Sequence, residues 1–276
     1  MIFTIPAPAP GVSDAISSGR LPTAAREDLE PLLRSLVMAW LPTGPKAGSN
    51  LEVRATRVVA KVLDWLEDQP GHHWQQRWNS WIGDGEQDWR PHPGSSGQGV
   101  KWESAYAISA LIVTGTVRPS YPWLLSKRRR RLWADWATYH DTDLYSRIAQ
   151  LTEAADGYRV TSKAISSLVM MSIVTGKSLS QLTGEDFLAA RSAHHARGVN
   201  YHMLPTCWVF AKQAGLLAGD PPSLDQLVAA KQLTPAELVD RHGIDHPGIR
   251  AVFVEYLTEV SVGCDYQTLT GVEVLL

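Results

Sequence analysis

Four short patterns in the second half of the chain place a hydroxyl side chain three residues before an acidic or amide side chain. They are SLSQ (178–181), TGED (183–186), SLDQ (223–226) and TPAE (234–237). In this spacing the hydroxyl accepts a bond from an N–H of the first helical turn, and the later side chain reaches back to the N–H of the hydroxyl residue. TPAE also has Pro235 at the first helical position, where a missing N–H costs nothing. The four patterns predict short helices joined by tight turns.

Apolar periodicity extends the helical prediction along the chain. Residues 24–41 and 51–68 have the pattern of amphipathic helices, separated by the loop PTGPKAGSN. Two later apolar stripes are Val209, Phe210, Gln213, Ala214 and Leu217, and then Ile249, Val252, Phe253, Tyr256 and Leu257. No segment alternates apolar and polar residues between hairpin turns, so the sequence predicts an all-α protein.

Composition divides the chain into three parts. Residues 1–23 contain PAPAP and are expected to form a disordered arm. Residues 24–157 are expected to form a Trp-rich helical region with a basic helix, and residues 158–276 a small helical bundle. The boundary between them is placed near Asp156 and Gly157, and 83–99 reads as a long polar loop.

Cysteine usage and apolar run lengths indicate the compartment. The two cysteines, Cys207 and Cys264, form no CxxC motif, so neither a disulfide scaffold nor a cysteine zinc site is expected. No stretch has the pattern of a signal peptide or the length of a membrane span. We expect a cytoplasmic protein without a membrane partner, a metal or a cofactor.

Tryptophan is concentrated in one region: eight of the 11 lie between Trp74 and Trp136. In WQQRWNSW, Trp74, Trp78 and Trp81 are spaced to share one helix face. We interpret this face as part of the core. A surface that stacks on bases and an interface with a partner helix are the alternatives.

Catalytic motifs are absent. The chain has no GxSxG, no phosphate-binding glycine loop and no HExxH, and its adjacent histidine pairs point in different directions on a helix. His140-Asp141 is similar to the HD motif of helical metal-dependent phosphohydrolases. That activity needs further ligands, for which His72 or His73 and Asp156 are the available residues. An HD-type hydrolase is kept as an alternative, and the chain is not expected to be an enzyme.

The segment LLSKRRRRLWADW (124–136) contains five consecutive cations, Lys127, Arg128, Arg129, Arg130 and Arg131. Around it, residues 101–163 carry ten Lys or Arg against six acids, whereas residues 219–276 carry three against nine. In a helix the five cations cover more than one turn, so the buried side must come from the flanking residues. These flanking apolar residues are Leu124, Leu125, Leu132, Trp133 and Trp136. Charge alone leaves two interpretations open, a solvated basic face and a contact with phosphates.

Residues 163–271 resemble a known family. The segments LTGEDFLAARSAHHARG and WVFAKQAGLLAGDPPSL are similar to the core-binding region of tyrosine recombinases and phage-type integrases, in which a helix commonly ends in a glycine-aliphatic turn followed by an acidic or amide residue and proline. Gly215-Leu216-Leu217 and Asp220-Pro221 match that turn. The segment IRAVFVEYLTEVSVGCDYQTLTG looks like the large integrase-type recombinases of high-GC bacteria.

The resemblance implies a helical bundle that precedes a catalytic domain. The family's catalytic domain supplies an arginine, a lysine, a His-x-x-Arg, a further His or Trp and a tyrosine nucleophile. His194 to Arg197 match the His-x-x-Arg and AREDL (25–29) superficially matches the first arginine motif, but no tyrosine follows at a suitable distance. We therefore expect no catalysis by this chain. Its last residues, DYQTLTGVEVLL, end on an apolar run, and the resemblance implies that more helix and the catalytic domain would follow.

The function implied is that of the DNA-binding part of a site-specific recombinase, with double-stranded DNA and further recombinase protomers as partners. The main phosphate contacts expected are Lys127 to Arg131, with Arg191, Arg197 and Lys212 secondary. The alternative is a non-catalytic helical module that binds another protein through an exposed apolar patch, for instance around GVEVLL at the end of the chain.

Overall fold

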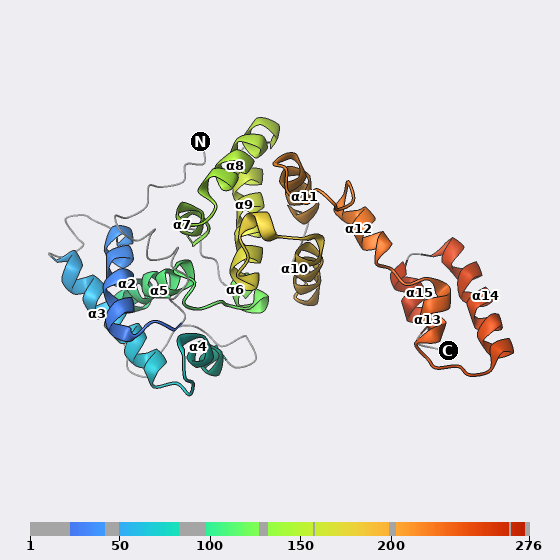
Figure 1. The fold of residues 1–276 in the computed structure, drawn as a ribbon, viewed down its shortest axis with the longest axis horizontal. Helices are drawn as coiled ribbons and strands as arrows, with labels where there is room; N and C mark the ends of the chain where they lie inside the picture. The colour runs from blue at the N-terminus through green and yellow to red at the C-terminus, as the bar shows by residue number, and fades with distance from the viewer. Residues whose placement is uncertain are drawn as a thin grey trace. The chain divides into compact units, whose positions relative to one another are not determined.

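The computed structural model describes residues 23–41, 50–82, 98–126, 132–156, 158–198, 203–264 and 266–273. Within these ranges every regular element is a helix and none is a strand, which confirms the all-α prediction (Figure 1). The chain separates into two compact units, residues 1–222 and residues 223–276. The boundary predicted at residue 157 falls inside the first unit, and the limits of independently folding domains stay a prediction. The expected arm lies, except for Thr23, outside the described residues, as does most of the polar loop at 83–99.

The first half of unit 1 is built on a central helix, α5 (Gln98–Val113). The helices α2 (Arg26–Trp40) and α3 (Leu51–Glu67) pack against α5 and against each other, and α4 (Trp74–Ile82) packs on α3. From Ala107 to Val113 α5 is buried on every side, as expected for a segment that is apolar all round. The predicted limits of α2 and α3 are confirmed to within two residues.

The tryptophans of α4 form a buried aromatic cluster. Trp74, Trp78 and Trp81 are 3%, 1% and 9% exposed. The ring of Trp78 makes edge contacts with Trp81 and Trp123, at centroid distances of 4.9 and 5.2 Å, and Trp65 contacts Trp81 at 3.8 Å. The prediction that this face belongs to the core is confirmed, because rings buried against one another have no face available for a base.

The second half of unit 1 is arranged around α9. Its helices are α6 (Tyr121–Ser126), α7 (Leu132–Tyr139), α8 (Thr142–Asp156), α9 (Tyr158–Thr175), the 3₁₀ turn η2 (Leu179–Gln181), α10 (Gly184–Ala196) and α11 (Met203–Gln213). The others all pack against α9, whose residues from Leu168 to Ile173 are buried. In the described part of residues 121–156 the chain forms three helices, α6 to α8, with Asp141 in the left-handed conformation (φ 48°) between α7 and α8.

All four predicted helix starts are confirmed. Ser178, Thr183, Ser223 and Thr234 directly precede η2, α10, α12 (Leu224–Ala230) and α13 (Pro235–Asp240). Three of them have the reciprocal bond, in which the side chains of Gln181, Asp186 and Glu237 accept from the backbone N–H three residues earlier at 3.0, 2.8 and 2.7 Å. At SLSQ the helix is a single 3₁₀ turn.

Unit 2 contains α12, α13, α14 (Pro247–Gly263) and α15 (Tyr266–Glu273). Leu238, Val239, Leu257 and Leu269 form its buried core. Leu233 N–H donates to the Tyr266 hydroxyl at 2.9 Å and so links the start of α13 to α15. No helix in the part of the chain that the structure describes is long and apolar enough to cross a lipid bilayer.

The apolar stripe predicted on α14 is divided between two environments. Leu257 is buried and Phe253 packs against the core of unit 2. Ile249, Val252 and Tyr256 are 49%, 62% and 47% exposed instead. The physical reason is size, because α14 has 17 residues and, among the described elements, packs mainly against the short helices α13 and α15.

Candidate nucleic-acid interface

Charge separates between the two units. Of the 26 Lys and Arg in the sequence, three lie in residues 223–276, which also hold eight of the 28 Asp and Glu. Unit 2 therefore has a formal net charge of −5, and unit 1 has one of +3. The formal net charges of the two units are therefore of opposite sign.

The five-cation run connects α6 to α7. Residues 127–131 lie outside the described part of the chain, so the structure gives no contacts for them. Their neighbours on both sides are anchored, since Leu124 on α6 is 3% exposed and Leu132 on α7 is 1% exposed. Trp136 is also buried, and Leu125 and Trp133 are half-buried, in agreement with the buried side predicted for this segment. Described residues that precede and follow the run in the sequence are thus packed in the core of unit 1.

Arg197, one of the secondary candidates, lies next to the helix that leads into this run. It follows α10 as its C-terminal cap, and its Nη1 donates to the Pro122 carbonyl of α6 at 2.9 Å. Arg191 is half-buried on α10. It precedes Arg197 by six residues, so at about 100° per residue the two arginines leave the helix on different faces. The bond to Pro122 places Arg197 beside α6.

Lys212, the third secondary candidate, stabilises the end of α11. Its Nζ donates to the Leu217 and Asp220 carbonyls at 2.9 and 2.7 Å. The helix ends in a Schellman turn, in which Leu216 N–H donates to the Ala211 carbonyl while Gly215 takes a positive φ of 87°. A cation at a helix C-terminus offsets the negative end of the helix dipole. Lys212 therefore has a structural role in the glycine-aliphatic turn that the sequence singled out.

A further cation beside α6 was missed by the sequence analysis. Arg118 lies three residues before α6, has an exposed side chain, and forms no ion pair with another described residue. Its backbone is fixed by Gln75 of α4, whose amide oxygen accepts from Arg118 N–H at 2.6 Å. Its guanidinium rests on Gly176, where an added Cβ would come within 2.2 Å of Cζ. A single arginine forms no recognisable motif in the sequence, so its position beside α6 is known only from its contacts with Gln75 and Gly176 in the structure.

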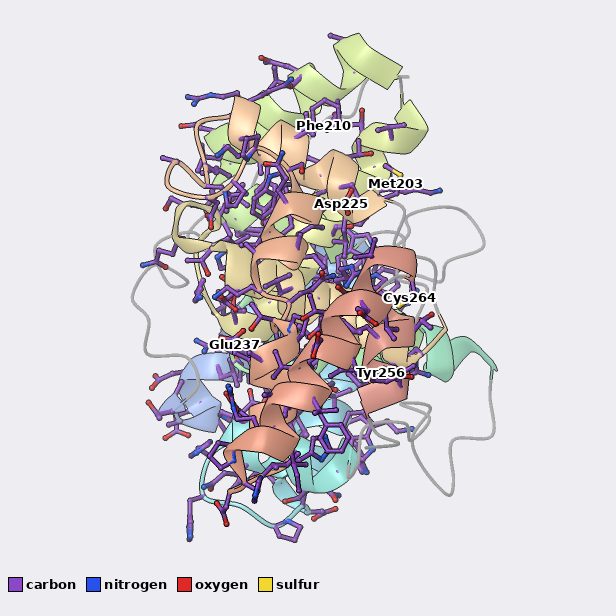
Figure 2. All side chains as sticks on the ribbon, turned by 90° about the vertical axis from the view of Figure 1, so that its right-hand side faces the viewer. Met203, Phe210, Asp225, Glu237, Tyr256 and Cys264 are labelled. Carbon is purple, nitrogen blue, oxygen red and sulfur yellow. The ribbon has the colours of Figure 1, made fainter. Side chains whose placement is uncertain are left out.

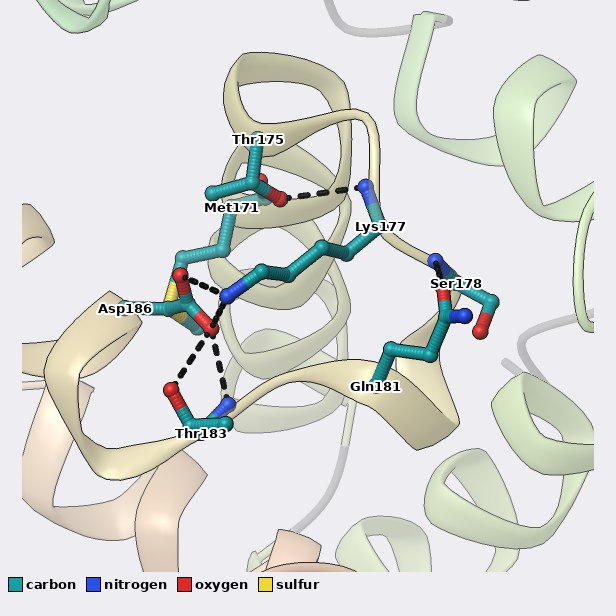
Figure 3. Close-up of polar contacts among 7 residues, drawn as sticks. All are labelled: Met171, Thr175, Lys177, Ser178, Gln181, Thr183 and Asp186. Atoms are coloured by element: carbon teal, nitrogen blue, oxygen red, sulfur yellow. Dashed lines mark hydrogen bonds and ion pairs between the residues drawn. The ribbon is translucent and has the colours of Figure 1, made fainter.

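The connection that carries Gly176 is held by a polar cluster at the start of α10 (Figure 3). The Asp186 carboxylate accepts two bonds from Lys177 Nζ at 2.8 Å and one from Thr183 N–H at 2.8 Å. The Thr175 hydroxyl accepts from Lys177 N–H at 3.2 Å. The cluster fixes the segment between α9 and α10, and with it the glycine that supports Arg118.

The histidine and aspartate of the HD pair have structural partners. His140 Nε2 lies 2.7 Å from the Val113 carbonyl, and the imidazole stacks on Trp136 at 3.9 Å. Burial lowers the pKa of His140 below its usual value, although its bond to Val113 acts in the opposite direction. The Asp141 carboxylate accepts a bond from Leu179 N–H. Among the described residues no three His, Cys, Asp or Glu side chains are grouped as a metal site would require.

Comparisons of this chain with protein-family models, curated proteins and solved structures found no match. The resemblance to the integrase core-binding region therefore stays a prediction.

Proposed function

We propose that this chain binds double-stranded DNA and is the DNA-binding part of a site-specific tyrosine recombinase. The observation that carries the proposal is the five-cation run between two helices that are anchored in unit 1. Four adjacent arginines repel one another, and phosphate groups relieve that repulsion with bidentate bonds. Arg118 and Arg197 support the proposal because both lie beside α6, from which the run extends.

The phosphate contacts account for affinity and for placement on the duplex. They carry no information on base sequence, because phosphate oxygens are the same at every step. The acidic charge of unit 2 limits the proposed surface to unit 1. The recombinase part of the proposal rests on the helical architecture and on the glycine-aliphatic turn that follows α11, in which Gly215 has a positive φ.

The salt dependence of duplex binding tests the proposal. The slope of log affinity against log salt is negative, and its magnitude decreases by about 0.9 for each phosphate group that the protein no longer neutralises. The double variant Arg129→Ala/Arg130→Ala should therefore flatten the slope by up to about 1.8, and Arg118→Ala by up to about 0.9. The matched control is Arg57→Ala/Lys61→Ala on α3, which removes the same charge from another part of unit 1 and should leave the slope nearly unchanged.

Two results would overturn the DNA proposal. One is an affinity for duplex DNA that does not change between low and high salt. The other is an equal effect of the two double variants, because a response to overall charge alone does not identify an interface.

The recombinase assignment has a separate test in selection from a pool of random duplexes. Recombinase protomers that bind as a pair should enrich two half-sites in inverted orientation, since a two-fold protein pair is mirrored by its site. Enrichment of no sequence, together with a normal salt slope, would leave DNA binding in place and remove the recombinase assignment.

A further inference from the structure

The exposed side chains Ile249, Val252 and Tyr256 form a continuous apolar stripe on α14 of unit 2, called here the α14 stripe. Their spacing of three and four residues places them on one helix face. Tyr256 lies on α14 in Figure 2, and each of the three side chains is about half exposed or more. The stripe lies beside the core-facing residues Phe253 and Leu257, so the apolar sector of α14 is wider than the core of unit 2 requires.

Two glutamates border this stripe on the side away from the core. Glu255 and Glu259 follow Val252 and Tyr256 by three residues, which makes each pair neighbours on the helix surface. Both glutamates are exposed, and neither forms an ion pair with another residue in the described ranges. Together with the net charge of −5 on the unit, they give the stripe an acidic edge.

We propose that the α14 stripe docks an amphipathic basic helix of another protein. Apolar side chains of that helix at i, i+3 or i+4 and i+7 pack between Ile249, Val252 and Tyr256, and its Lys or Arg side chains pair with Glu255 and Glu259. A second copy of unit 2 is a poor occupant, because it would bring four glutamates together. An anionic bilayer is repelled by Glu255 and Glu259 and by the net negative charge of unit 2. The proposal does not depend on DNA binding, which is assigned to unit 1.

The test measures binding of a synthetic amphipathic peptide, with leucines on one face and lysines beside them, to the full chain by fluorescence anisotropy. The variant Val252→Ser/Tyr256→Ser should bind the peptide at least about tenfold more weakly, since aromatic and apolar anchors dominate such interfaces. Its matched control is Val262→Ser, which removes a side chain on the same helix that is 89% exposed but lies outside the stripe. That control should change affinity by less than about twofold.

A second pair of variants isolates the acidic edge. Glu255→Lys/Glu259→Lys should weaken peptide binding about tenfold or more at low salt, and Asp225→Lys/Asp245→Lys should have a much smaller effect although the charge change is the same. If the serine variant loses helical circular dichroism, the two charge variants test the peptide-binding proposal in its place. The serine variants leave the charge of unit 2 unchanged and should not alter the salt slope of DNA binding, so failure of this proposal is distinguishable from failure of the proposed function.

Three results would overturn the proposal. The first is peptide binding that the stripe variants do not weaken, and the second is weakening by the control variants to the same extent. The third is sedimentation that shows the full chain dimerising through the α14 stripe, in which case its occupant is a second copy.

Discussion

Replacing Asp186 by alanine should destabilise unit 1 through the connection between α9 and α10. The carboxylate accepts bonds from Lys177 Nζ, from Thr183 N–H and from the Thr183 hydroxyl, the last at 3.1 Å. The residue is only 7% exposed, so water can replace few of these bonds on the aspartate side. The partner side is more open, because the Lys177 side chain is 39% exposed.

The expected magnitude follows from these bonds. Loss of the reciprocal cap at Thr183 costs about 1 kcal/mol. The ion pair with Lys177 adds about 1 kcal/mol, a value reduced for the exposure of the lysine. The free energy of unfolding should therefore fall by about 2 kcal/mol, which for a unit of this size lowers the melting temperature by about 4–8 °C.

Urea unfolding followed by circular dichroism and tryptophan fluorescence measures this effect. Asp186→Ala, Lys177→Met and the double variant form a cycle, and the coupling between the two residues should be about 1 kcal/mol. Ser180→Ala in the same connection is the control and should stay within about 0.5 kcal/mol of the unmodified chain. The reasoning is refuted if Asp186→Ala is as stable as that control, or if the cycle shows no coupling.

Two further predictions concern the core of unit 1. Trp78→Ala should lower the free energy of unfolding in urea by about 3–5 kcal/mol, because the ring is 1% exposed and contacts two other tryptophans. The control Val53→Ala, at a site that is 58% exposed, should change it by less than about 0.5 kcal/mol. Similar losses in both variants would contradict the buried cluster. Burial lowers the pKa of His140 in the folded state below its ordinary value of 6.5, so the unfolded chain binds more protons, and the free energy of unfolding should fall as the pH is lowered below about 6.5. Urea midpoints measured from about pH 8 to about pH 5 should show a smaller fall in His140→Gln, and equal falls would exclude His140 as the cause.

The candidate interface was only partly accessible to sequence reasoning. The run from Lys127 to Arg131 is contiguous, so its charge density is visible without a structure. Arg118 is a single arginine in a loop, and nothing local distinguishes it from a solvated side chain. Lys212 was selected for its charge, but the turn that follows α11 brings two carbonyls to its ammonium group. A cation forms hydrogen bonds within the protein only where other segments bring acceptor groups to it, and the local sequence does not show this.

Capped helix starts are encoded locally, and for that reason the sequence determined the four of them that it signals with a capping pattern. A cap such as Thr234 with Glu237 is completed within one helical turn, by bonds between residues three positions apart. The same holds for the aromatic face of α4, where the spacing of the tryptophans already indicates one side of a helix. These features need no knowledge of the rest of the chain.

Burial was decided by the tertiary structure. The five apolar residues of the stripe predicted on α14 are equivalent in sequence, yet Leu257 is buried while Val252 is 62% exposed. The difference arises because α13 and α15 are too short to cover both sides of a 17-residue helix. Apolar periodicity in the sequence indicates which side of a helix is apolar. The helices packed around it determine how much of that side is buried and how much remains exposed to a partner.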